Sequence, residues 1–130
     1  MLFNAAAALY ALLAVVDLGS AAPASVNHGD GTFFAPGLGA CGYTNSSTQH
    51  IAAVSKEFFD SFGGGYTNPN DAPICGKTAT IHYGDKTTQV EIVDRCGGCK
   101  GPTDVDMAPA AFADLADQSL GRIQITWTIN

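Results

Sequence analysis

The stretch that decides the fold is Val90-Glu91-Ile92-Val93-Asp94-Arg95-Cys96-Gly97-Gly98-Cys99, with Asp104-Val105-Asp106-Met107 close behind it. Apolar and polar residues alternate at its start, which predicts a strand that ends on an aspartate. A tight Cys-x-x-Cys loop follows, and a second acidic site lies about a dozen residues further on. Two carboxylates near a cysteine-tied loop predict a site for chemistry or for binding, and the other segments serve as the scaffold that presents it.

The N-terminus has the pattern of a secretory signal peptide. Residues 5–16 form an apolar run, and small residues follow at 19–24. The run is too short to span a bilayer comfortably, although the lack of Lys or Arg before it leaves a membrane anchor or a buried helix as alternatives. We expect a signal peptide at 1–21, with cleavage after Ala21 or alternatively Ala24, and a secreted, extracellular domain at 22–130.

The length and charge of the chain limit its possible partners. Its 130 residues are enough for one domain with a modest core, and its net charge is −6. It stays acidic after removal of residues 1–21, because Asp17 is the only charge lost. An acidic domain without a Lys/Arg cluster is a poor ligand for nucleic acid or anionic lipid. We therefore expect a monomer with no nucleic-acid partner and no membrane attachment in its mature form.

The four cysteines predict disulfides, as an even count does in a small secreted domain. From the residues alone, all three pairings are open. A zinc site would need a second Cys-x-x-Cys pair, and a thioredoxin-like site would need the pair to begin a helix, which Gly97-Gly98 does not favour. Copper binding by His28 would need cleavage directly before it. No Gly-rich nucleotide loop is present, so we expect neither a metal nor a cofactor.

The rest of the chain predicts one β-rich domain without repeats or linkers. Alternation in the last strand includes Trp127 among isoleucines, which places it in the core. Asn45-Ser46-Ser47 is an N-glycosylation sequon or an unmodified polar turn. Tyr43 and Tyr66 are expected in loops, where they could stack on sugars. We expect strands at 29–35, 51–54 and 122–129, a hairpin at 76–94 with its turn at 84–85, helices at 56–62 and 109–117, and loops at 36–42 and 66–73. Many short strands around one core indicate a small barrel.

Several motifs, in this order and spacing, resemble the double-psi β-barrel superfamily. The match is to small secreted fungal proteins related to rare lipoprotein A, expansin and barwin, and it covers nearly all of 29–130. The motifs are Gly31-Thr32-Phe33-Phe34, Gly37-Leu38-Gly39-Ala40-Cys41-Gly42, Val93-Asp94-Arg95-Cys96-Gly97-Gly98-Cys99, Asp104-Val105-Asp106-Met107-Ala108-Pro109-Ala110-Ala111-Phe112 and Ile123-Gln124-Ile125-Thr126-Trp127.

The resemblance implies an all-β, six-stranded double-psi barrel with short peripheral helices. It also implies the disulfides Cys41–Cys75 and Cys96–Cys99. Asp106 matches the aspartate of the expansin His-Phe-Asp motif, the general acid of the related endoglucanases, although Asp104-Val105 replaces His-Phe here.

Other positions complete or weaken the match to the family's site. Asp94 matches the acidic residue that ends the preceding strand, and Thr32 matches a threonine of the expansin groove. The endoglucanase base falls near Ala35, where no carboxylate stands. Cys96 replaces a tyrosine of bacterial expansins, and the second domain of expansins is missing.

Three hypotheses follow for the function. The first is a non-hydrolytic, expansin-like module that binds cell-wall polysaccharide in an acidic groove at Asp94 and Asp106. The second is a protein-binding module that inhibits papain-like cysteine proteases through loops such as 66–73. The third is weak lytic transglycosylase action with Asp106 as the acid, its pKa raised by Asp94. Against these stands a structural role, in which Asp94 fixes the Cys96–Cys99 loop and Asp106 caps the helix near Pro109.

Overall fold

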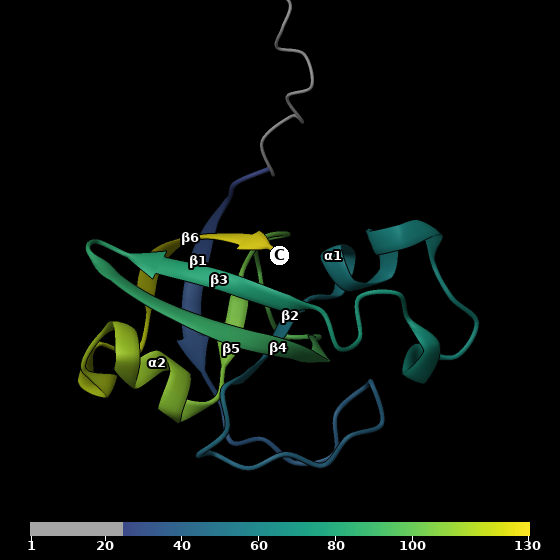
Figure 1. The fold of residues 1–130 in the computed structure, drawn as a ribbon, viewed down its shortest axis with the longest axis horizontal. Helices are drawn as coiled ribbons and strands as arrows, with labels where there is room; N and C mark the ends of the chain where they lie inside the picture. Colours follow the sequence, from purple (N-terminus) through teal and green to yellow (C-terminus); the bar gives the residue numbers. More distant parts are fainter. Residues whose placement is uncertain (1–24) are drawn as a thin grey trace, which may run out of the picture.

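Six strands close into a barrel in the order β1-β5-β2-β4-β3-β6 (Figure 1). The structure is a computed structural model that describes residues 25–130, so the expected signal peptide lies outside it. The strands are β1 (Asn27–Phe33), β2 (Ile51–Ser55), β3 (Thr78–Tyr83), β4 (Lys86–Cys96), β5 (Val105–Met107) and β6 (Ile123–Ile129). The predicted all-β, six-stranded barrel is confirmed.

Two of the six strand pairs in the barrel are parallel. β1 pairs with β5 and β2 pairs with β4 in parallel, and the remaining pairs are antiparallel. Short helices lie outside the barrel (Figure 1): α1 (Lys56–Ser61), α2 (Pro109–Leu115), and the 3-10 helices η2 (Phe62–Gly64), η3 (Pro69–Asp71) and η4 (Gln118–Leu120). None of the helices within residues 25–130 is long and apolar enough to cross a bilayer.

The core is filled from the alternating faces of the strands. In β6, Ile123, Ile125 and Trp127 are buried, as their alternation predicts. The indole of Trp127 donates a hydrogen bond to the Thr103 carbonyl at 2.9 Å, which satisfies its one polar group. The ring of Phe58 packs on it with centroids 4.8 Å apart. Trp127 therefore belongs to the core and not to a sugar-stacking face.

The first strand begins two residues earlier than predicted because its glycines lie inside it and do not form a turn. A Cβ on Gly29 would stand 2.2 Å from the Thr103 carbonyl oxygen, and one on Gly31 would stand 2.9 Å from Met107 Cε. At Gly29 the close contact is with backbone, so only glycine lets β1 approach Thr103 this closely, whereas at Gly31 the contact is with the flexible end of the Met107 side chain. The glycine-rich segment is thus a packing requirement of the closed barrel.

Two other elements differ from their sequence-based prediction. β5 was not predicted as a strand, because its three residues are too short for a periodic signal, yet Val105 and Met107 are buried on either side of Asp106. The predicted loop 66–73 contains η3, which begins at Pro69 after the Asn68 side chain accepts a hydrogen bond from Asn70 N. The short helices η2 and η4 are not predicted either, and the remaining elements agree with their predictions to within two residues.

Both disulfides implied by the resemblance are present. Cys41 joins Cys75 across a sequence separation of 34 residues, and Cys96 joins Cys99 across 3. Cys41 is buried against the core, whereas both cysteines of the second bridge are partly exposed. The first bridge links two long loops to the barrel, and the second closes only its own short loop.

Candidate functional site

An open cavity of about 520 Å³, here called the groove, lies against the ends of β1 and β4 and the middle of β2 and β5. It takes residues from every one of these strands and from the segments that follow β4 and precede β6. The residues lining it are Thr32, Phe33, Phe34, Ala53, Asp94, Arg95, Cys96, Gly97, Gly98, Cys99, Asp104, Asp106, Gly121 and Arg122.

The register of the strands lines up a row of side chains across the groove. Thr32 pairs with Asp106, Asp106 pairs with Ala53, and Ala53 pairs with Asp94. Directly paired residues point to the same face of a sheet, and all of these line the groove. The two carboxylates are two strand spacings apart, about 10 Å between backbones, with the small Ala53 between them. Asp94 and Asp106 thus both line the groove, with the buried Ala53 between them.

Asp106 is half-buried and hydrogen-bonded within the row. Thr32 Oγ1 donates to its Oδ1 at 2.8 Å. Burial raises the pKa of the Asp106 carboxyl, while the Thr32 hydrogen bond and Arg122 oppose the rise and Asp94 adds to it least. The direction matches the transglycosylase hypothesis, but desolvation and not Asp94 is the main cause. The alternative role of Asp106 as a helix cap is not found, because the N-cap of α2 is Ala108 and makes no side-chain hydrogen bond.

Asp94 holds the loop around Cys41 and not the loop of Cys96 and Cys99. Its Oδ1 accepts hydrogen bonds from the backbone N–H groups of Ala40 and Arg95, both at 2.8 Å. The close contact of Gly39 with Val93 O and Asp94 lets the two segments meet, since a Cβ there would stand 2.7 Å from that oxygen. Asp94 therefore connects one rim of the groove to the loop that Cys41 anchors.

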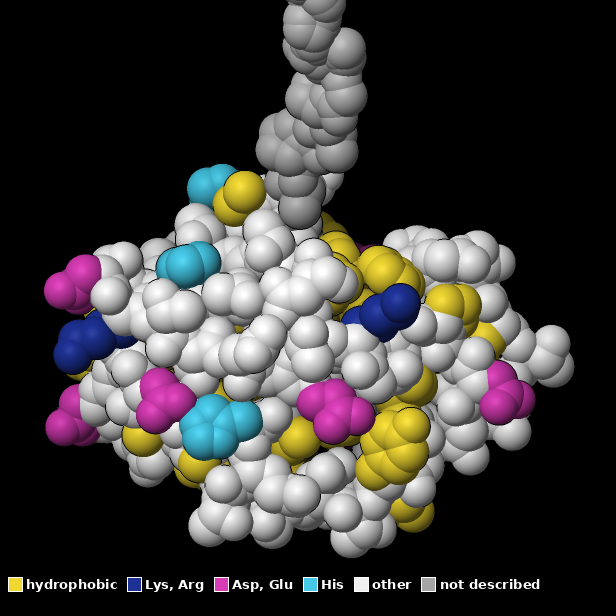
Figure 2. All heavy atoms as spheres, viewed as in Figure 1, with side chains coloured by type: hydrophobic (Ala, Val, Ile, Leu, Met, Phe, Trp, Pro, Cys, Tyr) yellow, Lys and Arg dark blue, Asp and Glu magenta, His cyan; other side chains and the backbone are white. Residues whose placement is uncertain are grey.

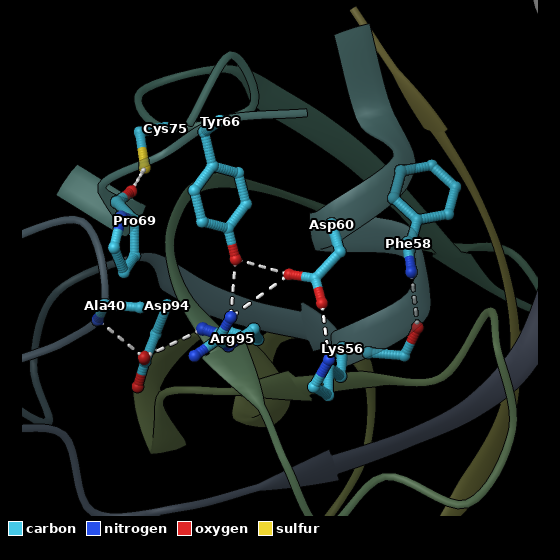
Figure 3. A network of polar contacts seen from close by, with 10 residues as sticks. Ala40, Lys56, Phe58, Asp60, Tyr66, Pro69, Cys75, Asp94 and Arg95 are labelled. Carbon is cyan, nitrogen blue, oxygen red and sulfur yellow. Dashed lines mark hydrogen bonds and ion pairs between the residues drawn. The ribbon is translucent and has the colours of Figure 1, made fainter. Parts of the chain in front are cut away.

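Arg95 lines the groove, and its guanidinium is held by a network of hydrogen bonds and ion pairs (Figure 3). The sequence analysis does not predict this network. Its Nη1 donates to Asp60 Oδ1 at 3.1 Å and to the Tyr66 hydroxyl at 2.5 Å. Tyr66 in turn donates to Asp60, which also pairs with Lys56 one helical turn away. Lys56 above all, then Tyr66 and Arg95, hold the pKa of the Asp60 carboxyl well below its usual range. Asp60 is thus an ionised anchor for the Arg95 guanidinium.

The two tyrosines expected to bind sugar do not line the groove. Tyr66 is partly buried, and its ring packs edge-on against Phe59 with centroids 5.7 Å apart. Its hydroxyl accepts a hydrogen bond from Arg95. Tyr43 is 46% exposed in the loop that Cys41 anchors. Their assignment as sugar-binding residues stays a prediction, and it would require a ligand that extends beyond the groove.

Three further residues line the groove, and the sequence analysis does not predict a site role for any of them. Arg122 donates to Asp30 Oδ2 at 2.9 Å and lies beside the row, and Phe34 adds a partly buried ring. Asp104 is buried and accepts from the backbone N–H groups of Asp30 and Gly101, so its role is structural. No local pattern marks Arg122 as a groove residue, because its place depends on strands far apart in sequence.

Two further features that the sequence analysis considers are the glycosylation sequon at Asn45 and possible metal ligands. Asn45 Nδ2 donates to Gln49 Oε1 at 3.2 Å in a loop that is otherwise exposed, so glycosylation stays a prediction. Within residues 25–130, His, Cys, Asp and Glu side chains form no group of three or more that could hold a metal ion.

Comparison with curated proteins gives relatives from fungi and bacteria, while no model of a known protein family matches the chain. The chain is 49% identical over 57 residues to Allergen Asp f 7 of Aspergillus fumigatus, covering 43% of this chain and 21% of the allergen. It is 34% identical over 94 residues to the Papain inhibitor of Streptomyces mobaraensis, covering 70% of this chain and 62% of the inhibitor. The chain thus spans less than two thirds of each of these relatives.

Comparison with solved structures gives the same barrel. The Streptomyces papain inhibitor matches with a TM-score of 0.72 and 30% identity, over 81% of this chain and 94% of the inhibitor. An expansin of Clavibacter michiganensis, solved with cellohexaose, matches with a TM-score of 0.66 and 21% identity, over 82% of this chain and 50% of the expansin. Cerato-platanin 3 of M. perniciosa matches with a TM-score of 0.55 and 20% identity, over 80% of this chain and 94% of that chain. The last two likenesses concern the fold alone.

Proposed function

This chain belongs to the double-psi β-barrel family of the Streptomyces papain inhibitor, and on that premise we propose that it is a secreted, non-enzymatic binding module whose groove takes a cell-wall polysaccharide chain. The observation that carries the proposal is the row Thr32, Asp106, Ala53 and Asp94 across four strands. It offers hydrogen-bonding groups on both sides of an open floor.

A neutral, hydroxyl-rich chain fits the charges of this groove best. The lining residues include Asp94 and Asp106 as acceptors and Arg95 and Arg122 as donors. A strongly charged polymer would meet repulsion from one of these pairs whatever its sign. Hydroxyl groups can both donate to the carboxylates and accept from the guanidinium groups. Phe34 adds an apolar surface for a sugar face.

Binding without hydrolysis follows from what the carboxylates already do. Hydrolysis of a glycosidic bond with inversion needs a second carboxylate that is free to activate water. Asp94 Oδ1 is occupied by two backbone N–H groups, and Ala35, the position of the endoglucanase base, carries no carboxylate. The arrangement of Asp94 and Asp106 therefore suits ligand binding better than acid–base catalysis.

The test is retention of residues 22–130 on insoluble cellulose, chitin and peptidoglycan. We expect retention on at least one polymer, and at least ten-fold weaker binding for Ala53→Leu, which would fill the floor between the carboxylates. Ala113→Leu on the exposed face of α2 is the matched control and should bind as wild type does. Circular dichroism shows whether each variant is folded. Absence of wild-type retention on all three polymers at low salt would contradict the proposal.

A second candidate function is inhibition of papain-like cysteine proteases. It is favoured by the likeness to the Streptomyces papain inhibitor, which extends over 94% of that protein. Disulfide-tied loops on a rigid barrel suit this role, because preordered loops lose little entropy on binding. Papain activity measured at a large molar excess of the protein tests it, and unchanged activity would exclude the function for papain.

A further inference from the structure

We propose that the loop of residues 37–44, here called the Cys41 loop, docks the protein against a papain-like cysteine protease through Leu38 and Tyr43. The inference rests on the second candidate function and names the surface that would carry it. This surface is separate from the groove, since neither side chain lines it.

The exposure of two large apolar side chains marks the Cys41 loop as a contact surface. Leu38 is 75% exposed and Tyr43 is 46% exposed. The other large apolar side chains exposed in residues 25–130, Val26 and Leu120, lie in separate segments. Figure 2, drawn from the same side as Figure 1, shows hydrophobic side chains at the lower right of this face, over the region of the β1–β2 connection.

The Cys41 loop is ordered by its own backbone before any partner binds. Leu38 and Thr44 form an isolated antiparallel bridge. Gly39 N donates to Tyr43 O at 3.0 Å, and Gly42 N donates to Gly39 O at 3.0 Å. The φ of Gly42 is +89°, a conformation that side-chain-bearing residues rarely adopt. The loop is thus a tight, closed turn with Leu38 and Tyr43 near its two ends.

The Cys41 loop is also fastened to the barrel at three points. Cys41 is bonded to Cys75, and its N–H donates to Val93 O at 3.1 Å. The Ala40 N–H donates to Asp94 Oδ1 at 2.8 Å. A partner that binds here therefore meets a surface that is already shaped, which reduces the entropic cost of association.

The chemistry of the two side chains favours a protein over a polysaccharide. An aliphatic side chain such as Leu38 offers no hydrogen bond to a sugar hydroxyl, and its burial is favourable only against apolar surface. Tyrosine is enriched among the residues that dominate protein–protein binding energy. The likeness to the Streptomyces papain inhibitor identifies a papain-like cysteine protease as the occupant.

The test measures the inhibition constant of residues 22–130 for papain, in wild type and in Leu38→Ser, Tyr43→Ser and the double variant. We expect the double variant to inhibit at least 30-fold more weakly, about the loss of one hot-spot side chain. Val26→Ser and Leu120→Ser remove equally exposed side chains elsewhere and should leave inhibition unchanged. Because both target side chains are exposed, the variants are expected to keep the wild-type melting temperature.

The outcomes separate this inference from the functions on which it builds. If wild type does not inhibit papain, both the second candidate function and the docking surface are overturned. If wild type inhibits and the double variant inhibits equally well, only the docking surface is overturned. If wild type forms a dimer that the double variant does not, the occupant is a second copy and the proposal fails. Polysaccharide retention by Leu38→Ser alone should match wild type, since Leu38 does not line the groove.

Discussion

At the scale of single residues, Asp106 shows how the closed barrel changes the chemistry of one side chain. Its carboxyl lies on a three-residue strand between two buried apolar residues, Val105 and Met107. Burial raises its pKa from the ordinary value of 3.8, although Thr32 donates a hydrogen bond to it. The folded protein therefore holds this proton more tightly than the unfolded chain does.

We predict that Asp106→Asn raises the melting temperature at neutral pH. With the folded pKa above the unfolded one, the folding stability of wild type falls as pH rises from about 3.8 through the folded pKa, and the loss is complete above it. The amide keeps the shape and an acceptor for Thr32 but carries no charge to bury. Thermal melts between about pH 3 and pH 8 should show the gain at high pH and convergence at low pH.

A matched control is Asp85→Asn in the exposed turn between β3 and β4, which should change the melting temperature little. A lower melting temperature for Asp106→Asn than for wild type at neutral pH would show that Thr32 and Arg122 outweigh desolvation. The same variant addresses the transglycosylase hypothesis. If wild type releases sugar products and Asp106→Asn releases them equally fast, Asp106 is not the acid.

At the scale of elements, the two disulfides have different tasks. Cys41–Cys75 joins the Cys41 loop to the segment that precedes β3, over a sequence separation of 34 residues. Cys96–Cys99 spans only 3 and forms part of the groove wall. A cross-link stabilises mainly by restricting the unfolded chain, and this effect grows with the length of the closed loop.

We predict that Cys41→Ala with Cys75→Ala destabilises the domain much more than Cys96→Ala with Cys99→Ala. By the chain-entropy account the longer bridge contributes roughly 4 kcal/mol. That is a large part of the 5–15 kcal/mol typical of a whole domain. Urea unfolding of the two double variants measures the difference directly. The second variant should instead weaken ligand binding in the groove, since its loop lines it.

Equal loss of stability in the two variants would show that loop entropy does not govern these bridges. If the Cys41 loop docks a protease, Cys41→Ala with Cys75→Ala should also inhibit papain more weakly at a temperature where the variant remains folded. Unchanged inhibition would mean that the hydrogen bonds to Val93 and Asp94 order the loop without the bridge.

At the scale of the whole molecule, the larger of two buried clusters is shared by all six strands. Trp127, the only tryptophan, is fully buried and donates its indole N–H to the Thr103 carbonyl. β6 lies between β1 and β3, so it closes the barrel. Loss of any strand would therefore expose the same core.

We predict that residues 22–130 unfold in a single cooperative transition. Single domains of this size usually do so, and the smaller buried cluster around Ile51 and Val93 stands on β2 and β4, which also build the main core. Tryptophan emission should shift to longer wavelength over the same urea range in which circular dichroism loses the strand signal. Two separate midpoints would contradict the prediction and identify a part of the barrel that opens first.

The sequence by itself determined much of the barrel and half of its candidate site. Alternation in residues 78–83, 86–92 and 123–129 depends only on neighbouring residues, so the strands and the burial of Trp127 could be read directly. The resemblance supplied the disulfide pairs and identified Asp94, Asp106 and Thr32. These residues stand in motifs, which can be recognised without knowing their partners.

Only the tertiary structure decided how those residues meet. Thr32 and Asp106 are 74 positions apart, and Ala40 and Asp94 are 54 apart, so no local pattern predicts either hydrogen bond. The three residues of β5 are strand because β1 and β2 flank them, not because their own sequence demands it. Register is set when the barrel closes, since each strand must satisfy two neighbours at once. The row across the groove exists for that reason.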